Sequence, residues 1–277
     1  MRFGPDGRVY ATDVERQRIF IWTSQGDFAE EWWVGDFEAP YLAGWRGDSL
    51  VVYNPPALRF DVLVDGLVEE RVDVPYDLSL EGLLTWGAAD QDGFYFKAVG
   101  ETIDGYVARL DSQGRELEQF PLSGNRFRQA GLLRIWGDSL LSLSGFRPIV
   151  DIIQPSAPLD SLALFGFDSP MLARSRTFFT GGRVRQGPPL LSASAAPAGP
   201  YLFALNSRPG WLYIDVFDQD GRLQYRLVEP DPRVNSQHQV QDLDARVRSD
   251  GGFELVVALT APTPSILAFT WQPPGSE

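Results

Sequence analysis

Short apolar strands recur at a nearly constant interval along this chain. Six segments of alternating or continuous apolar residues begin near Val9, Leu50, Phe94, Leu140, Tyr201 and Phe253. Neighbouring segments are about 40 to 60 residues apart, close to the period of a four-stranded propeller blade. A repeat of this length restricts the chain to architectures built from one β-unit used several times.

Two turn motifs repeat in phase with these strands. Trp45, Trp86 and Trp136 each stand before an acidic turn that leads into a recurring strand, and they are expected to pack between neighbouring blades. Asp and Gly recur in the hairpins at 65–66, 111–114 and 218–221, where Gly permits the positive φ of a tight turn. A two-sheet sandwich has similar strand spacing but no reason to repeat both turns in one order.

The sequence therefore predicts an all-β fold, a six-bladed β-propeller of four-stranded antiparallel blades. One domain is expected to cover residues 1–277. Its blades are predicted at about 1–38, 39–80, 81–128, 129–188, 189–239 and 240–277.

The first predicted blade carries the most specific pattern. A Pro5-Asp6-Gly7 turn opens it, alternating strands follow at 9–12 and 19–22, and a polar turn at 24–27 leads into a third strand. This stretch resembles an NHL-type repeat, and the whole chain resembles the NHL-repeat and TolB-like superfamily of six-bladed propellers. The resemblance concerns blade architecture and says little about activity.

The sixth predicted blade has strands near 253–259 and 266–271 but no outer strand before residue 277. Either this blade has three strands and an exposed edge, or an upstream segment of the native polypeptide supplies the fourth. We favour the second interpretation. Such a segment could carry an export signal, which would favour a periplasmic or extracellular location; otherwise the location is open.

Composition excludes several kinds of function. The net charge of −13 and the pI near 4.6 argue against nucleic acid, whose phosphates require clustered cations. No apolar run approaches the roughly 18 residues of a transmembrane helix. The absence of cysteine excludes disulfides, thiolate metal sites and a cysteine nucleophile.

Catalytic motifs are not apparent. His238 is the only histidine, and no Gly-x-Ser-x-Gly motif presents a nucleophilic serine. We therefore predict no catalytic residue and no cofactor.

Some six-bladed relatives bind a divalent cation over the central channel, and the resemblance implies candidate ligands at the ends of second strands. The candidates are Asp13, Asn54, Glu101 and Asn206. Asp and Asn also begin turns at strand ends by accepting backbone N–H bonds, and this structural role is the leading interpretation.

An insertion at 169–189 separates the fourth and fifth predicted blades. It contains Arg174, Arg176, Phe178, Phe179, Arg183 and Arg185, while Arg147 and Arg208 are predicted in loops on the same face. Clustered arginines with exposed aromatic rings suit a protein partner that bears carboxylates or phosphates, although an ordinary solvated loop is an equal alternative. Trp32 and Trp33 lie on an outer strand, where alternation exposes one ring as a second candidate contact.

These features favour a non-catalytic protein-interaction or scaffold propeller, an accessory subunit of a larger bacterial complex that is membrane-associated or extracytoplasmic. The alternative is a metal-dependent, lactonase-like hydrolase with its site at the central channel.

Overall fold

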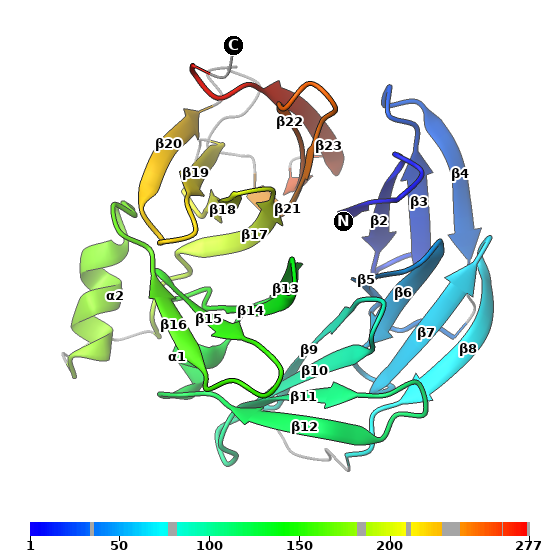
Figure 1. Cartoon of the computed structure of the whole chain (residues 1–277), viewed down its shortest axis with the longest axis horizontal. Coiled ribbons are helices and arrows are strands. Elements are labelled where there is room, and N and C mark those ends of the chain that lie inside the picture. The colour runs from blue at the N-terminus through cyan, green and yellow to red at the C-terminus, as the bar shows by residue number, and fades with distance from the viewer. Residues whose placement is uncertain are drawn as a thin grey trace. The chain divides into compact units, whose positions relative to one another are not determined.

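The computed structural model describes residues 1–33, 36–76, 82–181, 187–208, 212–228, 239–261 and 263–275. The chain divides into two compact units, Met1–Arg126 and Phe127–Glu277. Both consist of antiparallel strands joined in sequence order, and Figure 1 colours them along the chain.

The first unit holds three four-stranded blades. The first blade is β1 (Arg2–Phe3), β2 (Val9–Asp13), β3 (Arg18–Trp22) and β4 (Phe28–Trp33). The second is β5 (Tyr41–Arg46), β6 (Ser49–Asn54), β7 (Arg59–Val64) and β8 (Leu67–Asp73). The third is β9 (Leu84–Ala89), β10 (Phe94–Val99), β11 (Tyr106–Leu110) and β12 (Glu116–Pro121).

A single parallel bridge between Gly44 and Ala89 joins the innermost strands of the second and third blades. Gly44 has φ of 151°, and a Cβ on it would lie 2.2 Å from the Ala89 carbonyl oxygen. Only glycine allows the two strands to approach this closely.

The second unit continues the pattern after a short helix, α1 (Arg126–Gln129), at the boundary. The fourth blade is β13 (Leu133–Trp136), β14 (Ser139–Leu143), β15 (Ile149–Ile153) and β16 (Asp160–Ala163). Helix α2 (Leu172–Phe179) follows it. The fifth blade is β17 (Ser192–Ala198), β18 (Tyr201–Asn206), β19 (Tyr213–Phe217) and β20 (Leu223–Val228). The sixth has three strands among the described residues, β21 (Gln239–Val247), β22 (Phe253–Ala261) and β23 (Ser265–Trp271).

This architecture confirms the predicted all-β propeller of antiparallel blades. The recurring strands of the sequence are the second strands β2, β6, β10, β14, β18 and β22. In β6, β10 and β18 nearly every residue is buried, because both faces of a middle strand are covered by neighbouring sheets. That the chain forms one domain stays a prediction.

Two of the three repeated tryptophans join neighbouring blades, as expected. The indole N–H of Trp45 donates to the Phe3 carbonyl oxygen at 3.0 Å, and that of Trp136 donates to the Gly199 carbonyl oxygen at 2.9 Å. Trp86 contacts Lys97 of its own blade, whose ammonium lies 5.2 Å from the ring centroid, and its packing against a neighbouring blade stays a prediction. In the described part of the chain, no helix is long and apolar enough to cross a membrane.

Candidate functional site

Two blades carry the same polar arrangement where the second strand ends. Asn54 closes β6 and Asn206 closes β18, and both side chains are fully buried. Each amide Nδ2 donates to a backbone carbonyl in the connection that enters its blade, Asp36 O at 3.2 Å and Asp168 O at 2.7 Å. These asparagines therefore fix the incoming chain to the end of the second strand.

A buried aspartate on the third strand accompanies each asparagine. Asp61 and Asp215 have no exposed surface, and they pair in register with Val52 and Ala204. Because alternate residues share a face, each aspartate lies on the same side of its sheet as the strand-end asparagine. The sequence analysis did not identify these aspartates.

An arginine on the fourth strand faces each aspartate, with Asp61 opposite Arg71 and Asp215 opposite Arg226. A second arginine follows each asparagine, Arg59 as the first residue of β7 and Arg208 two residues after the end of β18. A sequence signal could have identified the sites: in two blades, an Asp stands within an apolar third strand and an Arg follows at the matching place in the fourth strand.

We name the two sets of residues here. The blade-2 strand-end site is Asp36, Asn54, Arg59, Asp61 and Arg71, and the blade-5 strand-end site is Asp168, Asn206, Arg208, Asp215 and Arg226.

The blade-5 strand-end site is closed by its own hydrogen bonds. Asp215 accepts from Asn206 Nδ2 at 3.0 Å and from Arg226 Nε at 2.8 Å, so both carboxylate oxygens are used. Arg208 Nη2 donates to the backbone and side-chain oxygens of Asp168 at 2.8 and 2.9 Å. The Arg208 guanidinium also lies 4.4 Å from the Tyr213 ring centroid. Among the buried side-chain atoms of this site that the structure describes, Asn206 Oδ1 and Arg208 Nε have no hydrogen-bond partner.

The blade-2 strand-end site has the same residue types but fewer hydrogen bonds. Arg59 Nε lies 2.8 Å and Arg71 Nε 3.4 Å from Asp61 Oδ1. These contacts are ion pairs without aligned hydrogen bonds: among the described residues, neither Asp61 oxygen, nor Asn54 Oδ1, nor Arg59 Nε has a hydrogen-bond partner. The two guanidiniums extend instead to Asp36 Oδ2, at 3.0 and 2.8 Å.

Electrostatics sets Asp61 apart. Burial raises the pKa of Asp61 above its ordinary value, and the attraction of Arg59 and Arg71 only partly opposes this. A buried polar group without a hydrogen bond costs about 1–3 kcal/mol, so several in one place require an explanation. A carboxyl with a raised pKa, next to two cations and an amide oxygen, is a set that can accept a proton and stabilise negative charge.

The fourth blade also has a buried aspartate on its third strand, and this one is hydrogen-bonded through both carboxylate oxygens. Asp151 is buried on β15, and Arg128 binds it with two Nη atoms, one of them at 2.8 Å. Ser161 Oγ of the facing strand donates to Asp151 at 2.6 Å. This bidentate pair ties α1 to its blade and leaves the carboxylate no role in chemistry.

A further buried network connects the first strands of the second unit. Arg134 Nη2 donates to Ser194 Oγ at 3.0 Å and to Asp242 Oδ1 at 2.9 Å, and Ser194 Oγ donates to the same oxygen at 2.6 Å. The strands β17 and β21 have register shifts at Ser192/Ser194 and Val240/Asp242, which turn Ser194 and Asp242 toward the arginine. Through these hydrogen bonds the network joins the first strands of three blades.

The other two candidate metal ligands are held by arginines. Asp13 accepts from the Arg16 backbone N–H at 2.9 Å and from its Nη1 at 2.6 Å. Burial raises the pKa of Asp13, but the hydrogen bonds from Arg16 outweigh this and lower it below the ordinary value. Glu101 forms an exposed ion pair with Arg126. The described residues contain no group of three or more His, Cys, Asp or Glu that could hold a metal ion. Asp13 and Glu101 therefore do not fit a metal site, and no step through a metal is derived.

The insertion forms helix α2, which the sequence analysis did not predict. Ser175 Oγ donates to the Phe146 carbonyl oxygen at 2.7 Å and anchors the helix to the fourth blade. The Phe178 ring packs edge-on against Phe127, with centroids 5.1 Å apart. Phe178 and Phe179 are consequently half-buried, where two exposed rings were expected.

The described arginines of the insertion and of its flanking loop are exposed to solvent. Arg147 is exposed, and its guanidinium lies 5.1 Å from the Phe179 ring centroid. Arg174 and Arg176 are exposed on α2. Arg183 and Arg185 lie outside the described residues, as does His238.

The rings of Trp32 and Trp33 lie on opposite faces of β4, as the alternation of side chains along a strand requires. Trp33 is 64% exposed, whereas Trp32 packs on Tyr10 with ring centroids 5.6 Å apart. Gly66 lies against the Trp32 ring, at a distance that leaves no space for a Cβ. Trp33 is therefore the ring of this pair that a partner could reach.

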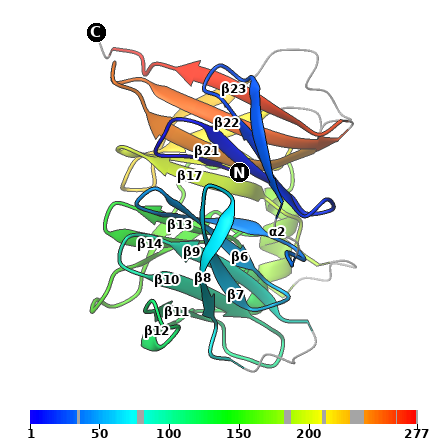
Figure 2. The same ribbon diagram turned by 90° about the vertical axis from the view of Figure 1, so that its right-hand side faces the viewer.

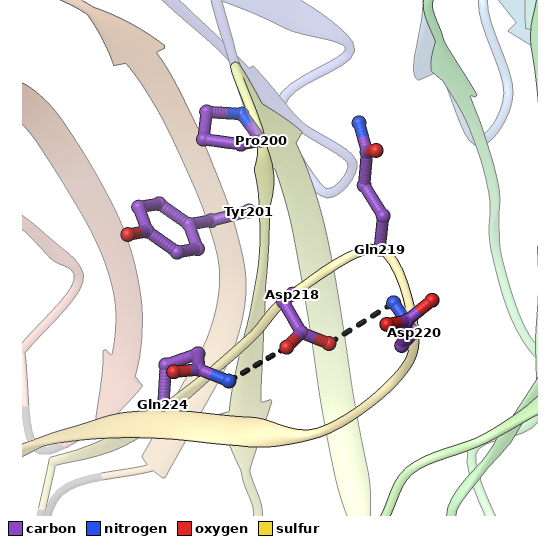
Figure 3. Close-up of a pocket in the computed structure, with 6 residues that line it drawn as sticks. All are labelled: Pro200, Tyr201, Asp218, Gln219, Asp220 and Gln224. Atoms are coloured by element: carbon purple, nitrogen blue, oxygen red, sulfur yellow. Dashed lines mark hydrogen bonds between the residues drawn. The ribbon is translucent and has the colours of Figure 1, made fainter.

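A shallow depression of about 410 Å³ lies on the fifth blade (Figure 3). It is lined by Pro200, Tyr201, Asp218, Gln219, Asp220 and Gln224. The Asp218 carboxylate accepts from the Asp220 and Arg222 N–H groups at 3.0 and 2.9 Å and from Gln224 Nε2 at 2.6 Å. Its oxygens are used in the hairpin turn, so this depression offers no reactive carboxylate.

The sequence matches no protein-family model and no curated protein. Solved structures resemble the chain nevertheless. A luciferin-regenerating enzyme superimposes on this chain with a TM-score of 0.59 at 13% sequence identity. The alignment covers 97% of this chain and 89% of the enzyme's chain. A streptogramin B lyase has a TM-score of 0.58 at 11% identity, and the alignment covers 98% of this chain and 82% of the lyase. BBS1N, in complex with ARL6DN, has a TM-score of 0.50 at 14% identity, and the alignment covers 99% of this chain and 79% of BBS1N.

The chain is a β-propeller. At these identities the likeness concerns the fold, and it does not identify the NHL or TolB-like subgroup. The comparisons do correct one prediction. A non-catalytic scaffold, with no enzymatic role, was favoured from the sequence, but the lyase and the luciferin-regenerating enzyme are enzymes on this fold. The BBS1N complex adds that such propellers also bind proteins.

Proposed function

We propose that this chain is a catalytic β-propeller of the NHL and TolB-like group, a hydrolase of the lactonase kind that reacts at the blade-2 strand-end site. One observation carries the proposal. Asn54 Oδ1, both Asp61 oxygens and Arg59 Nε are buried together without a hydrogen bond from the described residues, whereas the equivalent aspartate of the fifth blade is fully bonded.

The residues of this site suit ester hydrolysis. Asp61, with its raised pKa, takes a proton from a water molecule whose oxygen attacks the ester carbonyl carbon. Arg71 stabilises the negative charge that develops on the carbonyl oxygen, and Asn54 Oδ1 accepts a hydrogen bond from the attacking water. The carbon–oxygen bond to the leaving group then breaks, and Asp61 returns its proton to the leaving alkoxide.

An exposed ion pair lies next to the buried Asp61. The Arg71 and Asp36 side chains are 49% and 45% exposed, and the Nε of Arg71 lies 3.4 Å from Asp61 Oδ1. An exposed pair of this kind contributes about 0–1 kcal/mol, so a substrate can displace it at little cost. The carboxylate of Asp36 then becomes free to accept a hydrogen bond from the substrate.

The test is a hydrolysis assay on a panel of chromogenic lactones and esters, run separately with a chelator, with Mg²⁺ and with Ca²⁺. We expect D61N to lower kcat/KM by about 10²- to 10⁴-fold with its circular dichroism unchanged. The control D218N alters an acid of the depression in Figure 3 and should retain wild-type activity. Loss of activity in D218N with D61N active, or no hydrolysis under any condition, would contradict the proposal.

We also infer that the enzyme has an anion-binding partner surface on the insertion 169–189. The supporting observation is the exposed guanidinium of Arg147 over the Phe179 ring, on a helix that Ser175 anchors. A partner rich in carboxylates would pair with Arg147 and Arg176. A fluorescent poly-glutamate peptide should bind, and R147E should weaken its binding at least fivefold. Equal binding by R147E would place the contact elsewhere.

A further inference from the structure

Two arginines of the second blade converge on one exposed carboxylate. The strands β6, β7 and β8 of this blade are neighbours in its sheet, as Figure 2 shows. Arg59, at the start of β7, donates from Nη2 to Asp36 Oδ2 at 3.0 Å, and Arg71 Nη2 of β8 lies 2.8 Å from the same oxygen. We call Arg59 and Arg71 the arginine clamp, because two guanidiniums on one carboxylate are a common way to bind an anion.

The clamp is held on its inner side by a buried group. The Nε atoms of Arg59 and Arg71 lie 2.8 and 3.4 Å from Asp61 Oδ1. Each arginine therefore directs Nε to the buried Asp61 and Nη2 to the exposed Asp36. Because Asp61 holds the Nε side of both guanidiniums, the two Nη2 groups stay together when Asp36 leaves them. An anion that takes the place of Asp36 meets a site that is already formed.

The Asp36 side chain can leave the clamp without releasing its segment from the blade. Asn54 Nδ2 donates to the Asp36 carbonyl oxygen at 3.2 Å, and this hydrogen bond does not involve the Asp36 side chain. Ion pairs near the surface contribute little to stability, so the carboxylate is exchanged at low cost. Once it has left, two guanidiniums face the single carboxylate of Asp61, and this charge balance favours another anion.

The fifth blade has no such clamp in the described part of its strand-end site. Arg208 Nη2 donates to Asp168 Oδ2 at 2.9 Å, but Arg226 Nη2 donates to the Gly166 carbonyl oxygen at 3.2 Å. One guanidinium reaches the exposed aspartate there, and the other is occupied by the backbone. The convergence of two arginines on Asp36 is therefore not a requirement of the blade architecture.

We propose that the arginine clamp is a binding site for the carboxylate of a small molecule, and that the Asp36 carboxylate occupies this site until the ligand arrives. Asp36 itself shows the chemistry of the ligand, since its carboxylate is the group that the clamp holds. The Arg59 side chain is 15% exposed, so a slender group reaches it more readily than the surface of a folded protein does.

The substrate class follows if the site is catalytic, and this step rests on the proposed function. Asp61 lies at the inner side of both guanidiniums, so a bound carboxylate is close to the reacting group. The substrate is then an ester or lactone that carries a free carboxylate. A guanidinium has five N–H donors, which lets Arg71 hold the carboxylate through Nη2 and face the reacting carbonyl oxygen with Nη1.

Acetate is the probe for the site itself, with acetamide as its neutral analogue. In D36A, acetate at constant ionic strength should shift the Nε–H NMR signals of Arg59 and Arg71 saturably, and acetamide should leave them unchanged. Wild type should need about tenfold more acetate, because Asp36 competes for the clamp. The matched control D168A should bind acetate about tenfold more weakly than D36A, since one guanidinium faces that position.

This titration requires no turnover, so its outcome is independent of the hydrolysis assay. D36S serves for the same titration if circular dichroism shows that D36A is not folded. No saturable shift without the Asp36 carboxylate, an equal shift with acetamide, or equally tight acetate binding by D168A would overturn the carboxylate site.

The substrate class is tested with the nitrophenyl half-ester of adipate and its neutral amide analogue. Wild type should have a kcat/KM about tenfold higher for the half-ester. D36A should lower the KM of the half-ester about fivefold, while the KM of the amide analogue does not fall. Equal kcat/KM for the two esters would overturn the substrate class. Acetate binding by D36A without hydrolysis of either ester would refute the hydrolase and leave the carboxylate site in place.

Discussion

The second and fifth blades share four polar positions, Asp36, Asn54, Asp61 and Arg71 in one and Asp168, Asn206, Asp215 and Arg226 in the other, and use them differently. In the fifth blade, Asp215 takes hydrogen bonds from Asn206 and Arg226. In the second, the two arginines divide their contacts between Asp61 and the exposed Asp36, and Asp61 keeps no aligned hydrogen bond from a described residue. The difference shows how one blade position can serve stability in one copy and remain available for chemistry in another.

The largest expected effect distinguishes the two aspartates by stability. D215N should lower the free energy of unfolding by about 3 kcal/mol, because it leaves the Arg226 charge and the Asn206 amide without their shared acceptor. D61N should change it by less than about 1 kcal/mol, since it removes a buried charge that has no aligned hydrogen bond. Urea unfolding followed by circular dichroism measures both. Equal losses would show that the two sites are equally bonded.

The two asparagines give the next largest contrast. N206A removes two donated hydrogen bonds, to Asp168 O and Asp215 Oδ2, and should cost about 1–3 kcal/mol. N54A removes a single bond of 3.2 Å to Asp36 O and should cost about 0.5–1.5 kcal/mol. Thermal unfolding of the two variants side by side gives the order. A larger loss in N54A would reverse the comparison.

The pH dependence of Asp61 follows from its raised pKa. Because the folded pKa lies above the ordinary value of 3.8, the folded state binds the proton more tightly than the unfolded state does. The stability that protonation of Asp61 contributes is therefore present at low pH and is lost as pH rises from 3.8 through the folded pKa.

The unfolding free energy of wild type minus that of D61N should consequently decrease as pH rises across this range. Acids with lowered pKa, such as Asp13 and Asp111, act in the opposite direction below 3.8 and cancel in this difference. Denaturant unfolding at several pH values measures it. A difference that increases with pH would mean that the arginines, and not burial, dominate at Asp61.

The smallest expected effect on stability concerns Arg71. R71Q breaks an exposed ion pair with Asp36 and a longer contact of 3.4 Å with Asp61, and because the Arg71 side chain is 49% exposed it should change the unfolding free energy by less than about 1 kcal/mol. If Arg71 stabilises the charge that develops on the substrate, kcat for ester hydrolysis falls by about 10²-fold or more while stability is kept. Unchanged kcat in R71Q would assign it a purely structural position.

The blade architecture was predictable from the sequence because its signals are local. Period-two apolar strands and Asp-Gly turns act within a few residues, and β2, β6 and β10 begin at or next to the expected residues. Helix α2 was missed because it is only eight residues long and is stabilised by contacts with Phe127 and Phe146 that its own sequence does not show.

The strand-end sites were predictable only in part. Asn54 and Asn206 were candidates by position, since each closes a second strand. Their aspartates were not, because the pairing of Asp61 with Arg71 depends on the cross-strand register and a shift between Val62 and Leu63. Glu101 lies two residues beyond the end of β10, and an arginine distant in sequence, Arg126, pairs with it.

One experiment compares the two blades directly: the hydrolytic activity per folded molecule of D61N and D215N, with the folded fraction determined for the same samples by circular dichroism. We expect D61N to remain folded and to lose activity about 10²-fold or more, and D215N to lose stability while each folded molecule keeps its activity. If D215N loses activity per folded molecule and D61N retains it, the blade-2 strand-end site is not where this propeller carries out its reaction.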